Sequence, residues 1–445
     1  MRIGLDFGTT NSGAAVYDGQ KLLLFPLDRT ATTPAVLRST LYITREHETL
    51  IGREAIDAYY RQNTGRPSKM VRQYVGEIEM TFAELPTFVK DVYILVDEMT
   101  PGRLLHSLKS ELSSGYEGTT LFGRHYKLED LIALYLREIR ERVAATTGEP
   151  VDSVVLGRPV NYVGSTDAGG NTRAVNRLRH AAHLAGFKTI DFELEPVAAA
   201  LRYELTIDHP ENVAVFDFGG GTLDITVMRL GNPAERRVYA TGGVGIAGDA
   251  FDRRIIERLL LDHLGRGTTW GADENPFPSQ TIDALVDWQS IPSLNRPETL
   301  HFLQLAQATG NHPARVRALE SLLVNNLAIR MIDTVERAKI VLSGRHFTLI
   351  ELRDEDIDIW QPLTRSQFEW LIAESARHVE DCIQDTLARS GLAVNDIDTV
   401  IRTGGSAQIP LFIEMMGRIF GPEKVVLSDV FSSVAGGLAV KAYTG

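Results

Sequence analysis

Residues 3–11 read Ile3-Gly4-Leu5-Asp6-Phe7-Gly8-Thr9-Thr10-Asn11, and the middle of the chain repeats the pattern as Val215-Phe216-Asp217-Phe218-Gly219-Gly220-Gly221-Thr222-Leu223-Asp224. Each copy is an apolar strand that ends on an aspartate, followed by a turn of Gly and Thr and a second apolar stretch. This pattern predicts a β-hairpin, because glycine adopts turn conformations that other residues resist. A single copy has an ordinary explanation, a glycine-rich hairpin with a capping aspartate. The repeat, with one copy opening each half of the chain, predicts duplicated lobes that face each other.

Strand and helix patterns alternate through the rest of the chain. Residues 128–143 carry apolar side chains at helical spacing, and residues 152–156 read as a buried strand. Further helices are expected at 172–185, 196–205, 250–264, 313–342, 368–389, 409–420 and 432–443, with a strand at 397–401. Residues 266–300 are rich in Pro, Trp and Gly and are expected to form an irregular insertion. The alternation of strands with helices predicts an α/β fold.

Composition narrows the class of protein. A chain of 445 residues is too long for a usual single core, and its 23% of charged residues is ordinary for a globular protein. The net charge of −12 disfavours a broad nucleic-acid surface but allows one polyphosphate pocket. No apolar run reaches the roughly 20 residues of a membrane span, and no export signal is visible at the N-terminus. The single cysteine, Cys382, fits a reducing compartment. We therefore expect a cytoplasmic monomer without nucleic-acid or membrane partners.

The two hairpin turns have the chemistry of a polyphosphate site. A triphosphate needs N–H groups that can approach closely, hydroxyl donors and a cation. The turns Gly8-Thr9-Thr10-Asn11 and Gly219-Gly220-Gly221-Thr222 offer N–H groups and hydroxyls from opposite sides. Asp6, Asp217 and Asp224 can hold a hydrated Mg2+, which proteins bind through a few carboxylates and which keeps most of its water.

Two more glycine turns and one glutamate are weaker candidates. Thr403-Gly404-Gly405-Ser406 follows a predicted strand and precedes a predicted helix, a junction that presents N–H groups to a ligand. The turn Thr241-Gly242-Gly243-Val244-Gly245, which leads to Gly248-Asp249, is similar. Glu195 precedes Pro196 at a predicted helix start, where it can orient a water or a metal-bound water. Helix capping is the more ordinary interpretation of that glutamate.

Together these segments resemble the nucleotide-binding domain of the 70-kDa heat-shock (DnaK-type) chaperones, within the actin, hexokinase and heat-shock superfamily. The matching stretches follow the family order along almost the whole chain and lie at 3–12, 154–159, 195–201, 215–227, 248–252, 335–343, 362–369 and 403–410. The segments 107–110 and 431–439 are most similar to the short YegD-type members, which lack the peptide-binding domain. The resemblance implies an actin-like ATPase fold, with two ribonuclease-H-like lobes around a central nucleotide cleft and with inserted subdomains.

The resemblance also implies domain bounds. Lobe I is expected at residues 1–207, with an inserted subdomain at about 28–127 and with the C-terminal helix 430–445 packed back on it. Lobe II is expected at 208–429, with a mainly helical insertion at about 249–363. The chain stops at Gly445, after the last helix of this pattern. The apolar linker and the peptide-binding domain of full-length chaperones are therefore expected to be absent.

Roles at the phosphates follow from the same resemblance. Asp6 and Asp217 are implied to position hydrated Mg2+, while Thr9, Thr10 and Thr222 contact phosphates. Lys109 is similar to the lysine that reaches the γ-phosphate and the attacking water, with Lys69 and Arg72 as rival placements. Glu195 and Asp224 match carboxylates that order the metal waters or the nucleophile. The other residues implied to bind nucleotide are Gly8, Asn11, Gly219, Gly220, Gly221, Gly248, Asp249, Glu336, Lys339, Ser343, Gly404, Gly405 and Ser406.

The nucleoside end departs from the family pattern. Glu336, Lys339 and Ser343 match the nucleoside-facing helix, although an exposed, salt-bridged helix face is the ordinary alternative for the two charged residues. Ile340 and Gln408 stand where the chaperone pattern has two arginines that flank the adenine. A stacked guanidinium contributes about 0.5–2 kcal/mol through cation–π contact. Base choice is therefore less well specified by the sequence than phosphate and Mg2+ binding.

The resulting expectation is a Mg2+-dependent protein that binds ATP or ADP, hydrolyses ATP slowly by in-line attack of water, and opens and closes its lobes with the nucleotide. Client proteins or co-chaperones are the expected partners. Three alternatives stay open. They are a small-molecule kinase of the same superfamily, an actin-like assembly or scaffold ATPase, and a nucleotide sensor that binds without hydrolysis.

Overall fold

The computed structural model describes residues 1–31, 33–63, 66, 69–82, 85–165, 168–232, 234–286, 290–428 and 433–445, with backbone alone for 70, 72–82, 85–96, 168, 292 and 293. The described chain forms two compact units. Unit 1 contains residues 1–59, 103–251 and 372–445, and unit 2 contains residues 60–102 and 252–371. Both hairpins of the sequence repeat therefore belong to unit 1.

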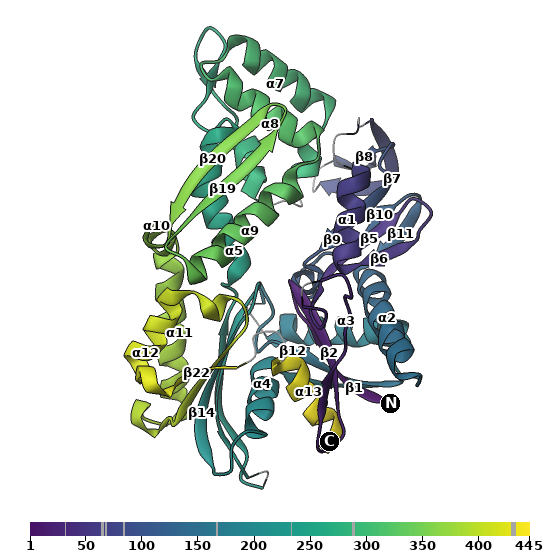
Figure 1. Ribbon diagram of the computed structural model, residues 1–445. Helices are drawn as coiled ribbons and strands as arrows, with labels where there is room; N and C mark the ends of the chain where they lie inside the picture. The colour runs from purple at the N-terminus through teal and green to yellow at the C-terminus, as the bar shows by residue number, and fades with distance from the viewer. Residues whose placement is uncertain are drawn as a thin grey trace. The chain divides into compact units, whose positions relative to one another are not determined.

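Two sheets with the same strand order form the frame of unit 1 (Figure 1). The first runs β13-β12-β1-β2-β3, with β4 beside β2, and the second runs β22-β21-β14-β15-β16. In each, the first hairpin strand pairs antiparallel with its partner and parallel with a strand from later in the chain. The strands of the first sheet are β1 (Arg2–Phe7), β2 (Asn11–Tyr17), β3 (Leu22–Leu24), β4 (Leu37–Arg38), β12 (Ser153–Arg158) and β13 (Thr189–Leu194). Those of the second are β14 (Glu211–Phe218), β15 (Leu223–Leu230), β16 (Arg237–Val244), β21 (Thr399–Thr403) and β22 (Val425–Leu427).

The sequence repeat therefore corresponds to a repeat in topology, and the predicted α/β, actin-like architecture is confirmed. The predicted lobe and subdomain bounds stay predictions. Smaller strand groups complete unit 1. They are β5 (Thr40–Thr44), β6 (Thr49–Ile51) and β9 (Gly102–His106) in one sheet, and the hairpin of β10 (Gly118–Leu121) and β11 (Arg124–Lys127).

Helices cover the sheets of unit 1. They are α1 (Gly52–Asn63), α2 (Leu128–Thr147), α3 (Ala168–Leu184), α4 (Glu195–Glu204), α5 (Gly248–Ile255), α11 (Ala373–Ser390), α12 (Pro410–Phe420) and α13 (Ser433–Thr444), of which α1 and α5 continue into unit 2. Helix α2 ends at Gly148, whose φ of 74° is the left-handed conformation common after helices. Helix α13 packs against α4 and against β1 and β2 (Figure 1). Gly437 permits the first of these contacts, because a Cβ there would overlap the Ala198 carbonyl.

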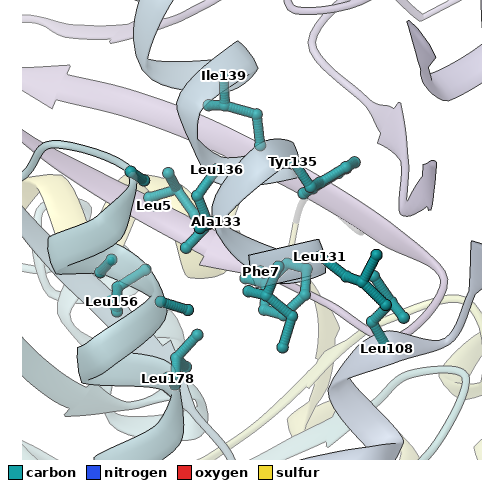
Figure 2. Close-up of a cluster of buried hydrophobic side chains, with 14 of the residues drawn as sticks. Leu5, Phe7, Leu108, Leu131, Ala133, Tyr135, Leu136, Ile139, Leu156 and Leu178 are labelled. Carbon is teal, nitrogen blue, oxygen red and sulfur yellow. The ribbon is translucent and has the colours of Figure 1, made fainter. Parts of the chain in front are cut away.

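A large apolar core joins the first sheet to α2 and α3, as Figure 2 shows. Leu5 and Phe7 from β1 and Leu156 from β12 meet a stripe of α2 and Leu178 of α3. That α2 stripe consists of Leu131, Ala133, Tyr135, Leu136 and Ile139. Leu108, from the 3-10 turn Leu108–Glu111, reaches the same core. Burial of a leucine of this kind contributes about 1.5–3 kcal/mol, so the core anchors the turn that carries Lys109.

Unit 2 is mainly helical and carries two long hairpins. Its helices are α6 (Ser279–Asp283), α7 (Pro297–Thr309), α8 (Pro313–Val324), α9 (Ala328–Gly344) and α10 (Arg365–Leu371). Its strands are β7 (Met70–Phe82), β8 (Leu85–Asp97), β17 (Thr269–Trp270), β18 (Asn275–Pro276), β19 (Phe347–Asp354) and β20 (Ile357–Thr364). The region 266–300 thus contains short helices and one small hairpin between irregular stretches. None of the described helices is long and apolar enough to cross a membrane.

Two sequence predictions are wrong about local structure. The single helix expected at 313–342 is two helices, α8 and α9, separated by residues 325–327. Asn326 has a φ of 54°, and the Asn325 side chain donates to Asp354 Oδ2 at 2.9 Å, so the break is held by a neighbouring hairpin. The glycine turn expected at 241–245 is instead mostly the end of strand β16. Its Gly242 lies against Thr386 of α11, and the small residue permits this close packing.

Candidate phosphate and metal site

The two hairpin turns of unit 1 contact each other directly. A Cβ added at Gly220 would overlap Thr10 Oγ1, and one added at Gly221 would lie 2.8 Å from Thr9 Oγ1. The threonines of the first turn therefore fill the space that the glycines of the second leave open. The predicted facing arrangement of residues 6–11 and 217–224 is present in the structure.

Strand register places the aspartates at the mouths of the hairpins. Asp6 lies opposite Gly13, whereas Asp217 lies opposite Asp224. Side chains that face each other across an antiparallel pair lie about 4.5–5.5 Å apart at Cβ, and like charges there repel. The second hairpin thus brings two carboxylates together, an arrangement that a proton or a cation stabilises.

A buried ion pair completes the cluster. Lys109 Nζ contacts Glu195 Oε1, and each residue is only 6% exposed. Glu195 is the first residue of α4, where Pro196 fits the helix start, and Gly157 of β12 lies against its side chain. Burial lowers the pKa of Lys109, but the carboxylates of Glu195 and Asp6 outweigh it and raise that pKa above its usual range. Lys109 is therefore a fixed cation beside Asp6.

The aspartates resist ionisation in the absence of a cation. Burial, and then repulsion by Glu195, raises the pKa of Asp6 to about 7. The same two causes raise the pKa of Asp224 to about 7 and that of Asp217 well above its usual value, the latter with added repulsion from Asp6 and Asp224. Four acidic side chains around one ammonium leave an excess of negative charge.

Asp224 is the most rigidly held of these carboxylates. Its Oδ1 accepts the Val160 N–H at 2.6 Å, and its Oδ2 accepts the Thr222 hydroxyl at 2.8 Å. It is 1% exposed, whereas Asp6 and Asp217 are partly exposed. Asp224 is therefore fixed by the protein, while Asp6 and Asp217 keep oxygens available for a ligand.

This donor set fits hydrated Mg2+. Among the residues that the structure describes, no three His, Cys, Asp or Glu side chains are placed to hold one metal ion together. Mg2+ binds through one or two protein carboxylates and fills its other positions with water and phosphate oxygens. Asp6 and Asp217, with raised pKa values and partial exposure, suit that mode.

The third glycine turn joins the second hairpin. Gly404 has a φ of 85° and lies against the Phe218 carbonyl, so a side chain there would be strained and would overlap the backbone. Ser406 Oγ donates to the Gly219 carbonyl at 2.7 Å and is largely buried. The N–H groups of Gly248 and Asp249 donate to the Gly219 and Gly220 carbonyls at 3.3 and 2.8 Å.

Other predicted residues lie in unit 2. Glu336, Lys339 and Ser343 are on α9. Lys339 is buried rather than on an exposed face, with its Nζ 2.6 Å from Asp252 Oδ2. Lys69, a rival of Lys109, is exposed and pairs with Glu98 at 2.6 Å. The side chain of Arg72, the other rival, lies outside the described residues.

Three residues near the cluster have no motif that singles them out. The Val160 N–H donates to Asp224, and the Ser39 hydroxyl donates to the Gly8 carbonyl of the first turn. Tyr162 is 3% exposed, and its hydroxyl has no hydrogen-bond partner in the described part of the chain. Their positions depend on tertiary packing between distant segments, which a single sequence does not reveal.

Comparisons with known proteins agree with the family resemblance seen in the sequence. The family model described as Hsp70 protein matches residues 2–276 and 321–444. The chain is 26% identical to chaperone protein dnaK3 of Synechococcus elongatus, covering 99% of this chain and 49% of that protein. It is 25% identical to the chloroplastic stromal 70 kDa heat shock-related protein of Pisum sativum, and the match covers 99% of this chain and 52% of that protein. The same values hold for the chloroplastic heat shock 70 kDa protein 7 of Arabidopsis thaliana. The chain spans about half the length of the curated relatives it matches.

Proposed function

Because the chain belongs to the Hsp70 family, we propose that it binds Mg2+ with ATP or ADP at the two hairpin turns of unit 1 and hydrolyses ATP slowly. The observation that carries the proposal is that Asp6 and Asp217, one from each hairpin, both lie close to the buried Lys109–Glu195 ion pair. An excess of carboxylates next to hydroxyls and glycine N–H groups suits a cation with a polyphosphate.

Each protein group has a distinct part in the proposed reaction. Bound Mg2+ would be held by Asp6 and Asp217 and would neutralise phosphate charge. The Lys109 ammonium, kept charged and oriented by Glu195, stabilises charge that develops on the γ-phosphoryl group. Asp224, fixed by Val160 and Thr222, has the part of a carboxylate that helps to order the metal waters or the attacking water. A ligand that touches both turns stabilises the arrangement in which they are in contact, and loss of the γ-phosphate weakens that bias.

Calorimetric titration tests the site directly. The purified chain is titrated with ATP and ADP, with and without Mg2+, and the Asp217→Ala and Thr222→Ala variants are titrated in parallel. We expect binding that depends on Mg2+ and that falls at least about tenfold in each variant, since each loses a charged or hydroxyl contact. Thr226→Val is the matched control, because this buried β15 hydroxyl has no hydrogen-bond partner in the described structure. Unchanged affinity in both site variants would remove the assignment.

Further assays separate the alternative functions. A small-molecule kinase transfers phosphate to a metabolite in a substrate panel, whereas the proposed ATPase releases inorganic phosphate alone. An assembly protein shows ATP-dependent sedimentation. A pure sensor binds Mg-ATP without phosphate release. Client proteins or co-chaperones are proposed partners, and a reducing, cytoplasmic location is proposed from the single cysteine.

A further inference from the structure

The two phosphate turns share a support that the sequence repeat does not contain. Ser39 Oγ donates to the Gly8 carbonyl at 2.7 Å, and Ser406 Oγ donates to the Gly219 carbonyl at 2.7 Å. Gly8 and Gly219 are equivalent, because each follows an Asp-Phe pair at the end of the first hairpin strand. The serines come from unrelated places, one between β4 and β5 and the other after β21.

Each serine is built into the protein rather than exposed on its surface. Ser39 is 6% exposed and Ser406 is 5% exposed. The Ser39 N–H donates to the Thr10 carbonyl at 2.9 Å, and the Ser39 hydroxyl also lies 2.9 Å from the Ser12 hydroxyl. In the second turn, the Gly248 N–H adds a bond to the Gly219 carbonyl. Buried hydrogen-bond donors of the protein thus fix the orientation of carbonyl groups in both turns.

The direction of these bonds determines where the N–H groups point. In a planar trans peptide, the carbonyl and the N–H lie on opposite sides. A Gly8 carbonyl turned toward Ser39 therefore turns the Thr9 N–H away from Ser39. A Gly219 carbonyl turned toward Ser406 likewise turns the Gly220 N–H away from Ser406. Neither N–H makes a hydrogen bond within the described structure.

We propose that Ser39 and Ser406 are a matched pair of positioning residues that orient the turn N–H groups toward the phosphates without touching the nucleotide. This inference rests on the proposed function. It also changes the expectation for Ser406, which the family resemblance places in contact with nucleotide. Its hydroxyl proton is already donated to Gly219, so its contribution is to the shape of the turn.

The test compares ligands that differ in their phosphate and nucleoside parts. Mg-ADP and Mg-pyrophosphate affinities are measured for wild type, Ser39→Ala, Ser406→Ala and the double variant, with Thr226→Val as control. Loss of one supporting hydrogen bond is expected to weaken Mg-ADP binding about fivefold to tenfold. Mg-pyrophosphate binding should weaken by the same factor, because the lost contribution lies at the phosphates. Thermal unfolding of each ligand-free variant reports separately on the fold.

Several outcomes would overturn the proposal. If Ser406→Ala weakens Mg-ADP but leaves Mg-pyrophosphate unchanged, Ser406 contacts the nucleoside instead. If neither alanine variant changes either affinity, the hydroxyls do not position the turns. Ser39→Thr and Ser406→Thr retain a hydroxyl, so a folded threonine variant should bind more tightly than its alanine counterpart, and equal weakening would argue for a packing effect. If wild type itself binds no Mg-ADP, the proposed function fails first and independently of the serines.

Discussion

The hairpins β1–β2 and β14–β15 have one backbone plan and two kinds of chemistry. In both, the first strand leads into Asp-Phe-Gly, and both hairpins lie at the same place in their sheets. In both, a serine hydroxyl donates a hydrogen bond to the carbonyl of that glycine. The first turn then carries threonine side chains, whereas the second carries glycines that leave room for them. The two hairpins therefore share a scaffold, while their turns are complementary rather than identical.

The carboxylates differ in the same way. Asp6 lies opposite a glycine, and its carboxylate has no hydrogen bond in the described structure. Asp217 lies opposite Asp224, whose carboxylate accepts two hydrogen bonds. Glu195 and Lys109 act on the carboxylates of both hairpins, but the second hairpin also has a hydrogen bond of its own, from Thr222 to Asp224. A side chain in the first hairpin should therefore be more sensitive to its neighbours than one in the second.

The largest effect is expected from removing the cation beside the first hairpin. Lys109→Met should lower ATP turnover about 100- to 1,000-fold, the scale for loss of one preorganised charge-stabilising group. It should also destabilise the metal-free fold by about 3–5 kcal/mol, because Glu195 is left buried without its partner. Steady-state phosphate release and denaturant unfolding measure the two effects.

Lys69→Met is the matched control for that experiment. Lys69 is exposed and its pair with Glu98 is solvent-screened, so its loss should leave turnover unchanged. A large loss in Lys69→Met together with a small loss in Lys109→Met would transfer the proposed role to the rival lysine.

The complementary fit of the turns predicts a graded glycine series. Gly220→Ala should destabilise the protein by about 1–3 kcal/mol, because its Cβ overlaps Thr10 Oγ1. Gly219→Ala should be near neutral, since nothing lies within 4 Å of a Cβ at that position. Neither glycine has a positive φ, so backbone strain does not confuse the comparison. Unfolding in urea measures both.

A second substitution then locates the cause. Thr10→Ala removes the overlapping oxygen, so adding it to Gly220→Ala should recover most of the lost stability, with a coupling of about 1–2 kcal/mol. Simple additivity of the two substitutions would show that the turns do not touch in solution.

Amide substitutions test the difference between the carboxylates. Asp224→Asn replaces an acceptor by an NH2 group that faces either the Val160 N–H or the Thr222 hydroxyl. Asp6→Asn removes a repelled charge without breaking a hydrogen bond. The metal-free Asp6→Asn variant should therefore be more stable than Asp224→Asn by about 1–3 kcal/mol. Equal stabilities would mean that the hydrogen bonds of Asp224 contribute nothing beyond its charge.

The sequence predicted this scaffold well, because local patterns carry it. The two Asp-Gly hairpins, α2 with its apolar stripe and α4 with its proline are present close to where the residues indicated. The break between α8 and α9 was missed, since it depends on a side-chain contact from Asn325 to a hairpin nearly thirty residues away. The burial of Lys339 against Asp252 and the two serine hydroxyls behind the turns were also beyond prediction. Each needs a tertiary partner that no periodicity or motif specifies.

The smallest expected effect is the pH dependence of the free energy of unfolding of the metal-free protein. Asp6 and Asp224 have pKa values near 7 in the folded protein and an unfolded value of 3.8, so the folded state binds more protons between these limits. The free energy of unfolding should therefore fall as the pH rises from about 4 through 7 and should level off on either side.

Allowing for the partial exposure of Asp6, we expect a change of about 1 kcal/mol between pH 6 and 7, read from urea unfolding in the presence of a chelator. Asp6→Asn and Asp224→Asn should each flatten the profile, because each removes one raised carboxyl. If only one of them does, the excess proton belongs to that hairpin alone, and the two hairpins differ in charge although they occupy equivalent places in their sheets. A profile that rises with pH would contradict the burial of this cluster, since it would require carboxylates that the fold stabilises in their charged form.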